Sequence, residues 1–326
     1  MIFKKINAIV QKLRVSRKKS FVIKHKNVLA SVSGRFNQHE KVAFIFQTFN
    51  KNENIVRILQ PFIEARAKNI ILFADGCIDE SPKTAHKQLI GKNHFVIQSN
   101  DTHEIRNYRY GLRLAMDLSC EYAILLQDDD IYTDGIFIWI ERALDAMCAD
   151  TSIAIVGGAG GYNYDPGFCL SADEGLASAI FEEFQDVNGR FRFRLGRYHS
   201  MTQSSAKASS VGQLTEFVAT VNRSPQMMRI STAFDLGFFP SELEPFQYDD
   251  DYNCLKSWSN GFKILHMPTS SKAGNIGEGG MRLYNSVTLN SRPAHFCRNW
   301  NYIMTKFGDD INSGKIDCIV NKANEQ

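Results

Sequence analysis

Three consecutive aspartates, Asp128, Asp129 and Asp130, directly follow the apolar run Tyr122–Leu126 and the single residue Gln127. The run has the length and composition of a buried strand, so the acids fall at its carboxyl end, where open α/β sheets bind ligands. Neighbouring carboxylates repel one another and are costly to desolvate. A divalent cation such as Mg²⁺ or Mn²⁺ relieves both costs, because it takes oxygen ligands. The triplet therefore predicts a metal-assisted enzyme that acts on a phosphate-bearing substrate.

A second run of acids, Asp249, Asp250 and Asp251, opens a stretch with helical spacing that ends at Gly261. Acids in the first turn of a helix are stabilised by its dipole, which gives this run a structural explanation of its own. The first triplet has a similar alternative, because acids can cap a helix that begins near Thr133. Three acids nevertheless exceed what a cap requires.

Strand and helix signals alternate around the first triplet. Apolar runs rich in β-branched and aromatic residues predict five strands, at Val42–Gln47, Asn69–Phe73, Phe95–Gln98, Tyr122–Leu126 and Ile153–Val156. Helical spacing lies between them, at residues 54–66, 81–89, 104–118 and from 133 onward. Repeated β-α units of this length predict an α/β fold with a mostly parallel central sheet flanked by helices.

After residue 157 this alternation breaks. The glycine-rich residues 157–167 are loop-like and lack the spacing of a dinucleotide-binding turn, and residues 171–213 are polar and irregular. The remaining elements that we expect are a strand at 214–221, a helix at 249–260, a strand at 262–265 and a final helix at about 293–307. A second glycine-rich loop lies at 272–282.

Length and composition place the chain among ordinary globular proteins. Its 326 residues suffice for one large domain or two small ones, and 44% of them are hydrophobic and 22% charged. We find no apolar run of the roughly 18 residues that a membrane-spanning helix needs, and no signal peptide. The seven cysteines are scattered without a C-x-x-C pair. This pattern predicts reduced thiols in a cytoplasmic protein.

The net charge of +3 hides an asymmetry. Residues 1–39 contain ten Lys or Arg and no Asp or Glu, which leaves 28 basic and 35 acidic residues in the remainder. In residues 1–19 the apolar positions lie near one helical face, namely Ile2, Ile6, Ile9, Val10 and Leu13. Residues 1–26 are therefore expected to lie on an anionic membrane surface, at the inner face of the cytoplasmic membrane. The alternative is a solvated leader. Nucleic acid is not an expected partner, because the basic face lacks interleaved aromatics.

Four segments carry a family resemblance. Gln47–Glu53 is similar to a first-strand motif Thr-Tyr-Asn-Arg-x-Glu, and Ala74–Ser81 resembles Asp-Asp-Gly-Ser-x-Asp. The first triplet resembles a D-x-D motif, and Asp249-Asp250, with a leucine, a lysine and Gly261 downstream, resembles Glu-Asp-x-x-Leu-x-x-Arg…Gly. From residue 41 to about 310, the chain resembles the GT-A glycosyltransferases of the large family 2. The resemblance implies the GT-A fold, and a metal-dependent inverting enzyme with a nucleotide-sugar donor, by expectation a UDP-sugar.

The same resemblance implies residue roles. Asp128 and Asp130 would hold Mg²⁺ or Mn²⁺ against the donor diphosphate, with Asp129 a further ligand or a partner of the ribose. The resemblance leaves the register of the motif open, because Gln127 can stand at the position of its first acid. Asp75 would accept the ring N–H of uracil, and Phe49 would stack on the base. The other residues expected to bind the nucleotide sugar are Gln47, Asn50, Glu53, Arg106 and Arg109. Each has a structural alternative: an Asp-Gly turn for Asp75, packing for Phe49, a helix turn for Glu53 and a surface salt bridge for either arginine.

Asp250, with Asp249 beside it, is the expected catalytic base that takes the proton of the acceptor hydroxyl. His266 is the expected third metal ligand, with His295 as the alternative, because imidazole suits Mn²⁺. The 272–282 loop would be a lid over the donor, with Arg282 meeting the diphosphate.

The predicted organisation is a leader at 1–40, a catalytic domain at 41–310 and a C-terminal tail at 311–326. Within the domain, 41–160 would bind the nucleotide sugar and 161–310 the acceptor, a saccharide or lipid-linked glycan of a bacterial surface polysaccharide. One rival is a nucleotidyltransferase, which would need a glycine-rich phosphate loop after the first strand, where this chain has Thr48–Glu53. The other rival is a non-catalytic binding relative, against which the two acid runs argue.

Overall fold

A computed structural model gives the structure of this chain. It describes residues 22–26, 39–89, 94–130, 132, 135–160, 181–185, 191–195, 215–246, 248–269 and 286–325, with the backbone alone at 22–26, 39, 159–160, 181–185, 191–195, 224 and 286–297. The glycine-rich loop with Arg282, the capping residue Thr133 and the side chain of His295 lie outside the described residues. The predictions for them stay predictions.

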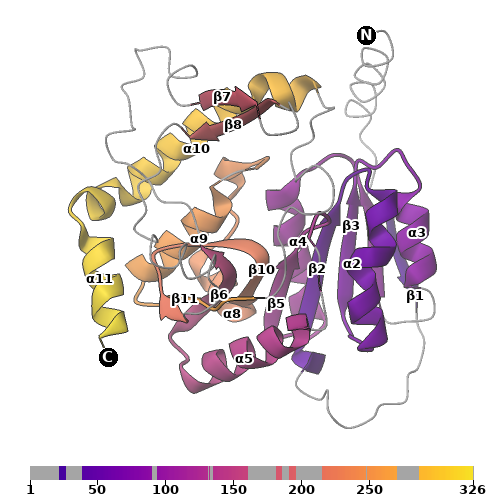
Figure 1. Ribbon diagram of the computed structural model, residues 1–326, viewed down its shortest axis with the longest axis horizontal. Helices are drawn as coiled ribbons and strands as arrows, with labels where there is room; N and C mark the ends of the chain where they lie inside the picture. Colours follow the sequence, from indigo (N-terminus) through magenta and orange to yellow (C-terminus); the bar gives the residue numbers. More distant parts are fainter. Residues whose placement is uncertain are drawn as a thin grey trace.

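A sheet of nine strands runs through the molecule in the order β1-β4-β3-β2-β5-β10-β6-β11-β9 (Figure 1). In chain order the strands are β1 (Val22–Lys26), β2 (Val42–Thr48), β3 (Ile70–Asp75), β4 (His94–Ser99), β5 (Tyr122–Leu126), β6 (Ile153–Gly160), β9 (Glu216–Phe217), β10 (Val221–Arg229) and β11 (Lys263–His266). Two further strands, β7 (Phe181–Gln185) and β8 (Phe191–Leu195), pair with each other. The five expected strands before residue 157 are all present.

The sheet is mostly parallel. Strands β2 to β6 and β11 point in one direction, whereas β1, β9 and β10 run against them. The predicted α/β class is therefore confirmed, with an antiparallel strand, β10, inserted between β5 and β6.

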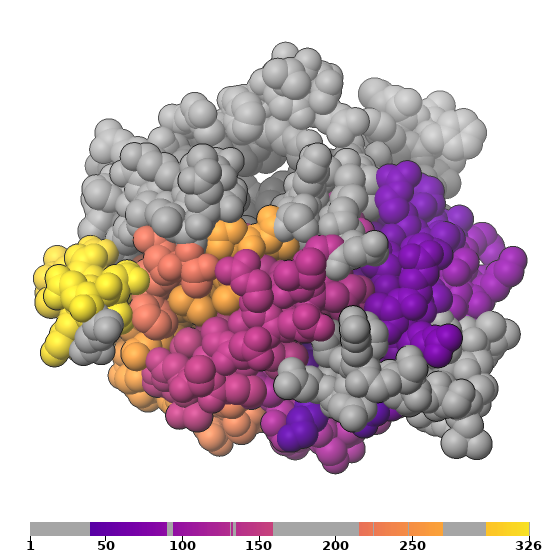
Figure 2. Space-filling model, turned by 60° about the horizontal axis from the view of Figure 1, so that its bottom comes forward, coloured from indigo at the N-terminus to yellow at the C-terminus, as the bar shows by residue number. Residues whose placement is uncertain are grey.

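Helices cover both faces of the sheet. They are α2 (Asn52–Glu64), α3 (Ser81–Gln88), α4 (Glu104–Asp117), α5 (Gly135–Ala149), α8 (Ile230–Leu236), α9 (Asp249–Ser259), α10 (Ser286–Asn312) and α11 (Lys315–Asn324), with short 3-10 turns η1 (His39–Lys41) and η3 (Ser241–Leu243). Buried side chains of α2, α3 and α5 form one core with the sheet, and those of α4, α8, α9, α10 and α11 form the other. Figure 2 shows the magenta middle of the chain lying between the indigo N-terminal part and the orange and yellow C-terminal part.

Two parallel neighbours, β2 and β5, bring distant segments together at one edge of the sheet. Phe46 pairs with Leu126, so the residues after β2 and the residues after β5 leave the sheet side by side. The antiparallel β10 pairs Gln226 with Leu125, so its amino end, Val221–Arg223, lies at that same edge. The carboxyl edge of the sheet is therefore where β2, β5 and the start of β10 meet.

Helix α4 lies very close to the sheet. A Cβ added to its Gly111 would stand 2.9 Å from Ile45 Cγ2 and 3.2 Å from a ring carbon of Phe73. Only glycine allows this approach without moving a packed core residue. The approach sets the position of the first two turns of α4, which carry Glu104 and Tyr108.

Several sequence expectations are wrong in detail. The strand expected at 214–221 is only Glu216–Phe217, followed by a new strand that starts at Val221, and the loop expected from residue 157 is still strand to Gly160. Residues 22–26 of the expected leader form strand β1, which pairs with β4. The expected tail contains helix α11, whose Ile316 and Val320 are buried, because they recur at helical spacing on one face. Helix α10, at Ser286–Asn312, is also longer than the helix expected at about 293–307.

Two further observations concern the described part of the chain. None of its helices combines the length and the apolar character that crossing a bilayer requires. No disulfide bond forms among the five cysteines that are described, Cys77, Cys120, Cys148, Cys254 and Cys318.

Candidate active site at the carboxyl edge of the sheet

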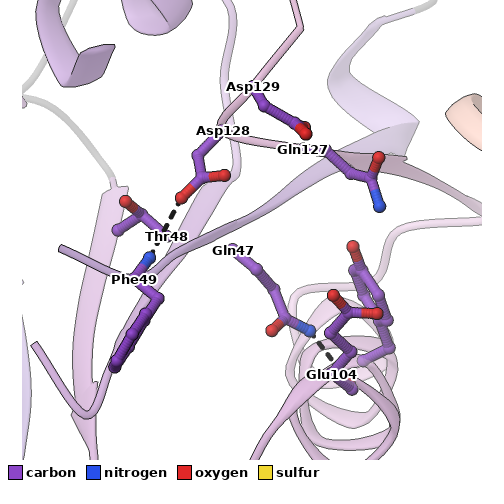
Figure 3. A pocket seen from close by; sticks show the side chains of 8 residues that line it. Gln47, Thr48, Phe49, Glu104, Gln127, Asp128 and Asp129 are labelled. Atoms are coloured by element: carbon purple, nitrogen blue, oxygen red, sulfur yellow. Dashed lines mark hydrogen bonds between the residues drawn. The ribbon is translucent and has the colours of Figure 1, made fainter. Parts of the chain in front are cut away.

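A recess lined mostly by polar residues opens where β2, β5 and α4 meet, and it encloses about 370 Å³ of empty space including its open mouth. Its lining comes from the end of β2, the start of α4 and the residues after β5, and consists of Gln47, Thr48, Phe49, Glu104, Tyr108, Gln127, Asp128 and Asp129 (Figure 3). Four residues of the predicted set, Gln47, Phe49, Asp128 and Asp129, are thus brought together. We call this recess the edge pocket.

Asp128 is held by the loop that follows β2. Its Oδ2 accepts the backbone N–H of Phe49 at 3.0 Å, and its Oδ1 lies 3.3 Å from Nζ of Lys51. Burial raises the pKa of the Asp128 carboxyl above its ordinary value, and the ammonium of Lys51 opposes that rise. Asp128 is therefore a desolvated carboxylate that already has one cationic neighbour.

Asp129 and Asp130 point to different surroundings. Asp129 lines the edge pocket and is only 3% exposed, yet no described residue forms a hydrogen bond with its Oδ1. Asp130 is fully buried, and its Oδ2 accepts the hydroxyl of Tyr132 at 2.8 Å. The chain turns at residues 128 and 129, so alternate acids do not face the same side. The pair that shares the pocket is Asp128 and Asp129, which differs from the predicted pair of Asp128 and Asp130.

The fit to a divalent cation rests on that pair. Their carboxylates are suitable oxygen ligands, and the buried Asp129 Oδ1 is a polar atom in need of a partner. Within the described residues, no three His, Cys, Asp or Glu side chains gather closely enough to hold an ion by themselves. His266 lies at the end of β11, opposite Gly157, and does not line the pocket. The structure therefore does not place His266 beside the two aspartates.

A buried arginine that the sequence did not single out joins the second acid run to the pocket. The guanidinium of Arg223 lies 3.1 Å from Glu104 Oε2, 3.0 Å from Asp249 Oδ2 and 3.2 Å from Asp250 Oδ2, with its side chain 8% exposed. It also stacks over the ring of Tyr108. Three carboxylates from α4 and α9 thus share one guanidinium from β10. We call these four charged residues the Arg223 cluster.

Crowding and burial govern protonation in the Arg223 cluster. Burial raises the pKa of Glu104 to about 7, although Arg223 opposes the rise. Burial likewise raises the pKa of Asp250 well above its ordinary value, with the nearby carboxylates of Asp249 and Asp251 adding to the shift and Arg223 opposing it. A raised pKa makes a carboxylate a stronger proton acceptor than an exposed aspartate. Asp250 Oδ1 has no hydrogen bond to a described residue, so one oxygen is left for such a proton.

The other nucleotide-binding candidates from the first motif divide into two groups. Gln47 and Phe49 line the pocket, where the amide of Gln47 donates to the backbone oxygen of Glu104 at 2.8 Å. Asn50 instead accepts the backbone N–H of Ile78 at 2.7 Å and thereby ties two loops together. Glu53 is exposed in the first turn of α2.

Asp75 has a structural role in this arrangement. It is fully buried at the end of β3, where its oxygens accept the backbone N–H groups of Thr102 and His103 at 2.9 and 2.8 Å, and the hydroxyl of Ser99. These bonds hold the loop before α4. Because the carboxylate is enclosed and bonded in this way, the structure does not offer it to a base, and the predicted contact with uracil stays a prediction.

Arg106 and Arg109 do not reach the pocket. Both donate to the carboxylate of Glu244, and Arg109 also donates to the backbone oxygen of Phe239 at 3.1 Å. The structure therefore favours the salt-bridge alternative for both arginines. They join α4 to the segment around η3. Among the described residues, Lys51 and Arg223 are the cations that pair with carboxylates lining the pocket, Asp128 and Glu104.

The residues missed by sequence reasoning are Glu104, Tyr108, Lys51 and Arg223. Glu104 and Tyr108 lie one helical turn apart at the start of α4, a spacing that only marks a helix face. Arg223 comes after the mostly apolar residues 217–221 and Asn222, and an isolated basic residue near such a run was the one signal available. Its partners lie 26 residues or more away in the chain, so the signal names no partner.

Comparison with known proteins finds a structural similarity and no match in sequence. No protein-family model matches the chain, and no curated protein matches it in sequence. Among solved structures, the chain is similar to the crystal structure of residues 1–349 of TarS from S. aureus, with 13% sequence identity and a TM-score of 0.43. The match covers 70% of this chain and spans 59% of that structure. An identity this low transfers no residue role to this chain.

Proposed function

We propose that the chain is a metal-dependent inverting glycosyltransferase that moves a sugar from a nucleotide sugar, by expectation a UDP-sugar, to a hydroxyl of a saccharide or glycolipid. The observation that carries the proposal is the meeting of two acid runs at one edge of the sheet. Asp128 and Asp129 line the edge pocket, and Asp249 and Asp250 reach it through Arg223 and Glu104. Such a transfer needs one group for the leaving diphosphate and another for the acceptor.

The first acid pair would serve the leaving group. Asp128 and Asp129 would hold Mg²⁺ or Mn²⁺, which when bound supplies positive charge against the diphosphate of the donor. Phe49, half-buried at the pocket wall, offers a ring face on which a base can stack, and Gln47 offers amide polarity beside it.

The second acid pair would serve the acceptor. Asp250 would take the proton of the attacking hydroxyl, for which its raised pKa and its unbonded Oδ1 suit it. Arg223 would keep that carboxylate oriented through contact with its other oxygen, at 3.2 Å. Asp249, bound to the same guanidinium and fully buried, would support the arrangement.

A panel of nucleotide sugars with Mn²⁺ or Mg²⁺ tests the proposal, scored by donor hydrolysis and by thermal shift. We expect at least one donor to be hydrolysed and to stabilise the protein in a metal-dependent manner. If every donor on the panel leaves both measurements unchanged, the proposal is wrong.

The variant Asp250→Asn tests the assignment of the base. We expect transfer to fall by at least about a hundredfold, because general base catalysis contributes roughly that much, while donor affinity stays within a few-fold. Asp309→Asn, at an exposed position of α10, is the matched control. Unchanged transfer in Asp250→Asn would remove this residue from the chemistry and leave the donor site standing.

A further inference from the structure

Lys51 occupies an unusual position for a lysine. It follows β2 and precedes α2, with its side chain only 13% exposed, and its Nζ lies 3.3 Å from Oδ1 of Asp128. Buried lysines are rare because the ammonium loses its hydration. Within the described part of the chain, Nζ forms this ion pair but no hydrogen bond. An ammonium group with three donors is therefore held in place mainly by the charge of one carboxylate.

The ammonium stands close to where a divalent cation would bind Asp128. Oδ2 of this carboxylate faces the backbone N–H of Phe49, so Oδ1, which faces Lys51, is the oxygen left for a cation. Two cations on one carboxylate oxygen repel each other strongly in a desolvated place. A divalent ion at Asp128 and Lys51 in its present position are thus in competition.

Charge balance indicates where the ammonium goes. A divalent cation and a diphosphate ester carry opposite charges of similar size, so a ligand that brings both leaves the net charge of the pocket nearly unchanged. Lys51 then need not leave the pocket and needs only a new anionic partner. A lysine suits this exchange because its charge is compact and its stem is flexible, whereas the planar fork of an arginine prefers a fixed carboxylate.

We propose that Lys51 is an exchangeable counter-cation of the edge pocket. In the empty pocket it neutralises Asp128. In the loaded pocket it yields Asp128 to the divalent cation and turns to the diphosphate of the ligand. This inference rests on the proposed function only in taking a metal-bound diphosphate as the ligand.

The variant Lys51→Met tests the exchange, because it keeps the length of the stem and removes the charge. The probes are Mn²⁺ alone and then inorganic pyrophosphate at saturating Mn²⁺, both measured by titration calorimetry. We expect Mn²⁺ alone to bind roughly tenfold more tightly than to the wild type, because its competitor is gone, and pyrophosphate to bind roughly tenfold more weakly, because one charged contact is lost. A merely structural lysine would not move the two affinities in opposite directions.

Two further variants complete the test. Lys83→Met removes an exposed lysine of α3 that pairs with Glu80, the residue before the helix. It should change neither the Mn²⁺ affinity nor the pyrophosphate affinity. Lys51→Gln keeps a polar end without the charge and should show the same tighter Mn²⁺ binding and weaker pyrophosphate binding. It replaces Lys51→Met if that variant does not fold. The exchange is overturned if both affinities fall together, if neither differs from that of the control, or if the wild type binds neither probe. If pyrophosphate binds as expected but no nucleotide sugar is turned over, the transferase proposal fails and the exchange stands.

Discussion

At the scale of single residues, the three aspartates after β5 do different work. Asp128 pairs with Lys51, Asp129 faces the edge pocket with an unbonded oxygen, and Asp130 is buried against Tyr132. The resemblance to a D-x-D motif favoured Asp128 and Asp130 as the cation ligands and left the register of the motif open. The contacts favour the adjacent pair of Asp128 and Asp129 as cation ligands.

Two substitutions distinguish Asp129 from Asp130 as the second cation ligand beside Asp128. Asp129→Asn should weaken Mn²⁺ binding by about tenfold or more with little loss of stability, because it removes a cation ligand whose Oδ1 has no hydrogen bond to a described residue. Asp130→Asn should cost about 1–3 kcal/mol of unfolding free energy, because it disturbs a buried hydrogen bond, and leave Mn²⁺ affinity within about twofold. Calorimetry and urea denaturation measure the two quantities. The reverse pattern would restore Asp130 as the ligand.

The raised pKa of Glu104 predicts a pH dependence of stability. Burial moves this pKa from 4.5 to about 7 in the folded chain, so between these values the folded chain holds a proton that the unfolded chain has released. The stability that goes with the protonated group is present below pH 4.5 and is lost as the pH rises to about 7. Glu104→Gln should reduce the slope of the unfolding free energy against pH in this range by up to about 1.4 kcal/mol per pH unit. Urea unfolding at several pH values measures it, and an equal slope in both proteins would refute it.

At the scale of elements, the position of the antiparallel strand β10 determines which charged residues meet at the site. It enters the sheet between β5 and β6, and its amino end brings Arg223 between α4 and α9. The sequence did not predict this strand, because Asn222, Ser224 and Pro225 are poor strand formers and interrupt the apolar pattern. The pairing register with β6 shifts between residues 222 and 226, which is where the proline is accommodated.

Because Arg223 joins three elements, its removal should be costly. Arg223→Met leaves Asp249 and Asp250 buried without their cation, and we expect a loss of about 3–5 kcal/mol in the free energy of unfolding. Arg223→Lys should fall between the wild type and this variant, because an ammonium keeps the charge but cannot reach three carboxylates at once. Urea denaturation is the measurement, with Arg142→Met, at an exposed position of α5, as the control. A loss no greater than that of the control would mean that the cluster does not hold these elements together.

At the scale of the whole molecule, charge is divided unevenly along the chain. Every charged side chain in residues 1–39 is basic, whereas the remainder of the chain has more acidic than basic residues. Residues 22–26 form an edge strand of the sheet, so the part of the predicted leader that remains a candidate for membrane contact is 1–21. The expectation of a protein at the inner face of the cytoplasmic membrane depends on those residues.

Vesicle binding tests this expectation. Residues 1–21 carry seven Lys or Arg, and each contributes about 1 kcal/mol near an anionic surface at moderate salt. The full chain should sediment with vesicles that contain phosphatidylglycerol, release at high salt, and ignore vesicles of phosphatidylcholine alone. A variant without residues 1–21, which keeps β1, should bind neither. If that variant binds the anionic vesicles as well as the full chain does, the leader is not the membrane contact.

The amino-acid sequence by itself determined the β-α alternation from β2 to β6, the two acid runs and the helix that begins at Asp249. These features are local: apolar spacing and turn residues act over a few positions, and the structure has them where they were expected. Only the tertiary structure decided which charged groups meet. Asp75 is enclosed by a loop that begins 24 residues later, and Arg106 meets Glu244 across 138 residues. Such partners are chosen by how helices and strands pack, and local spacing does not encode that packing.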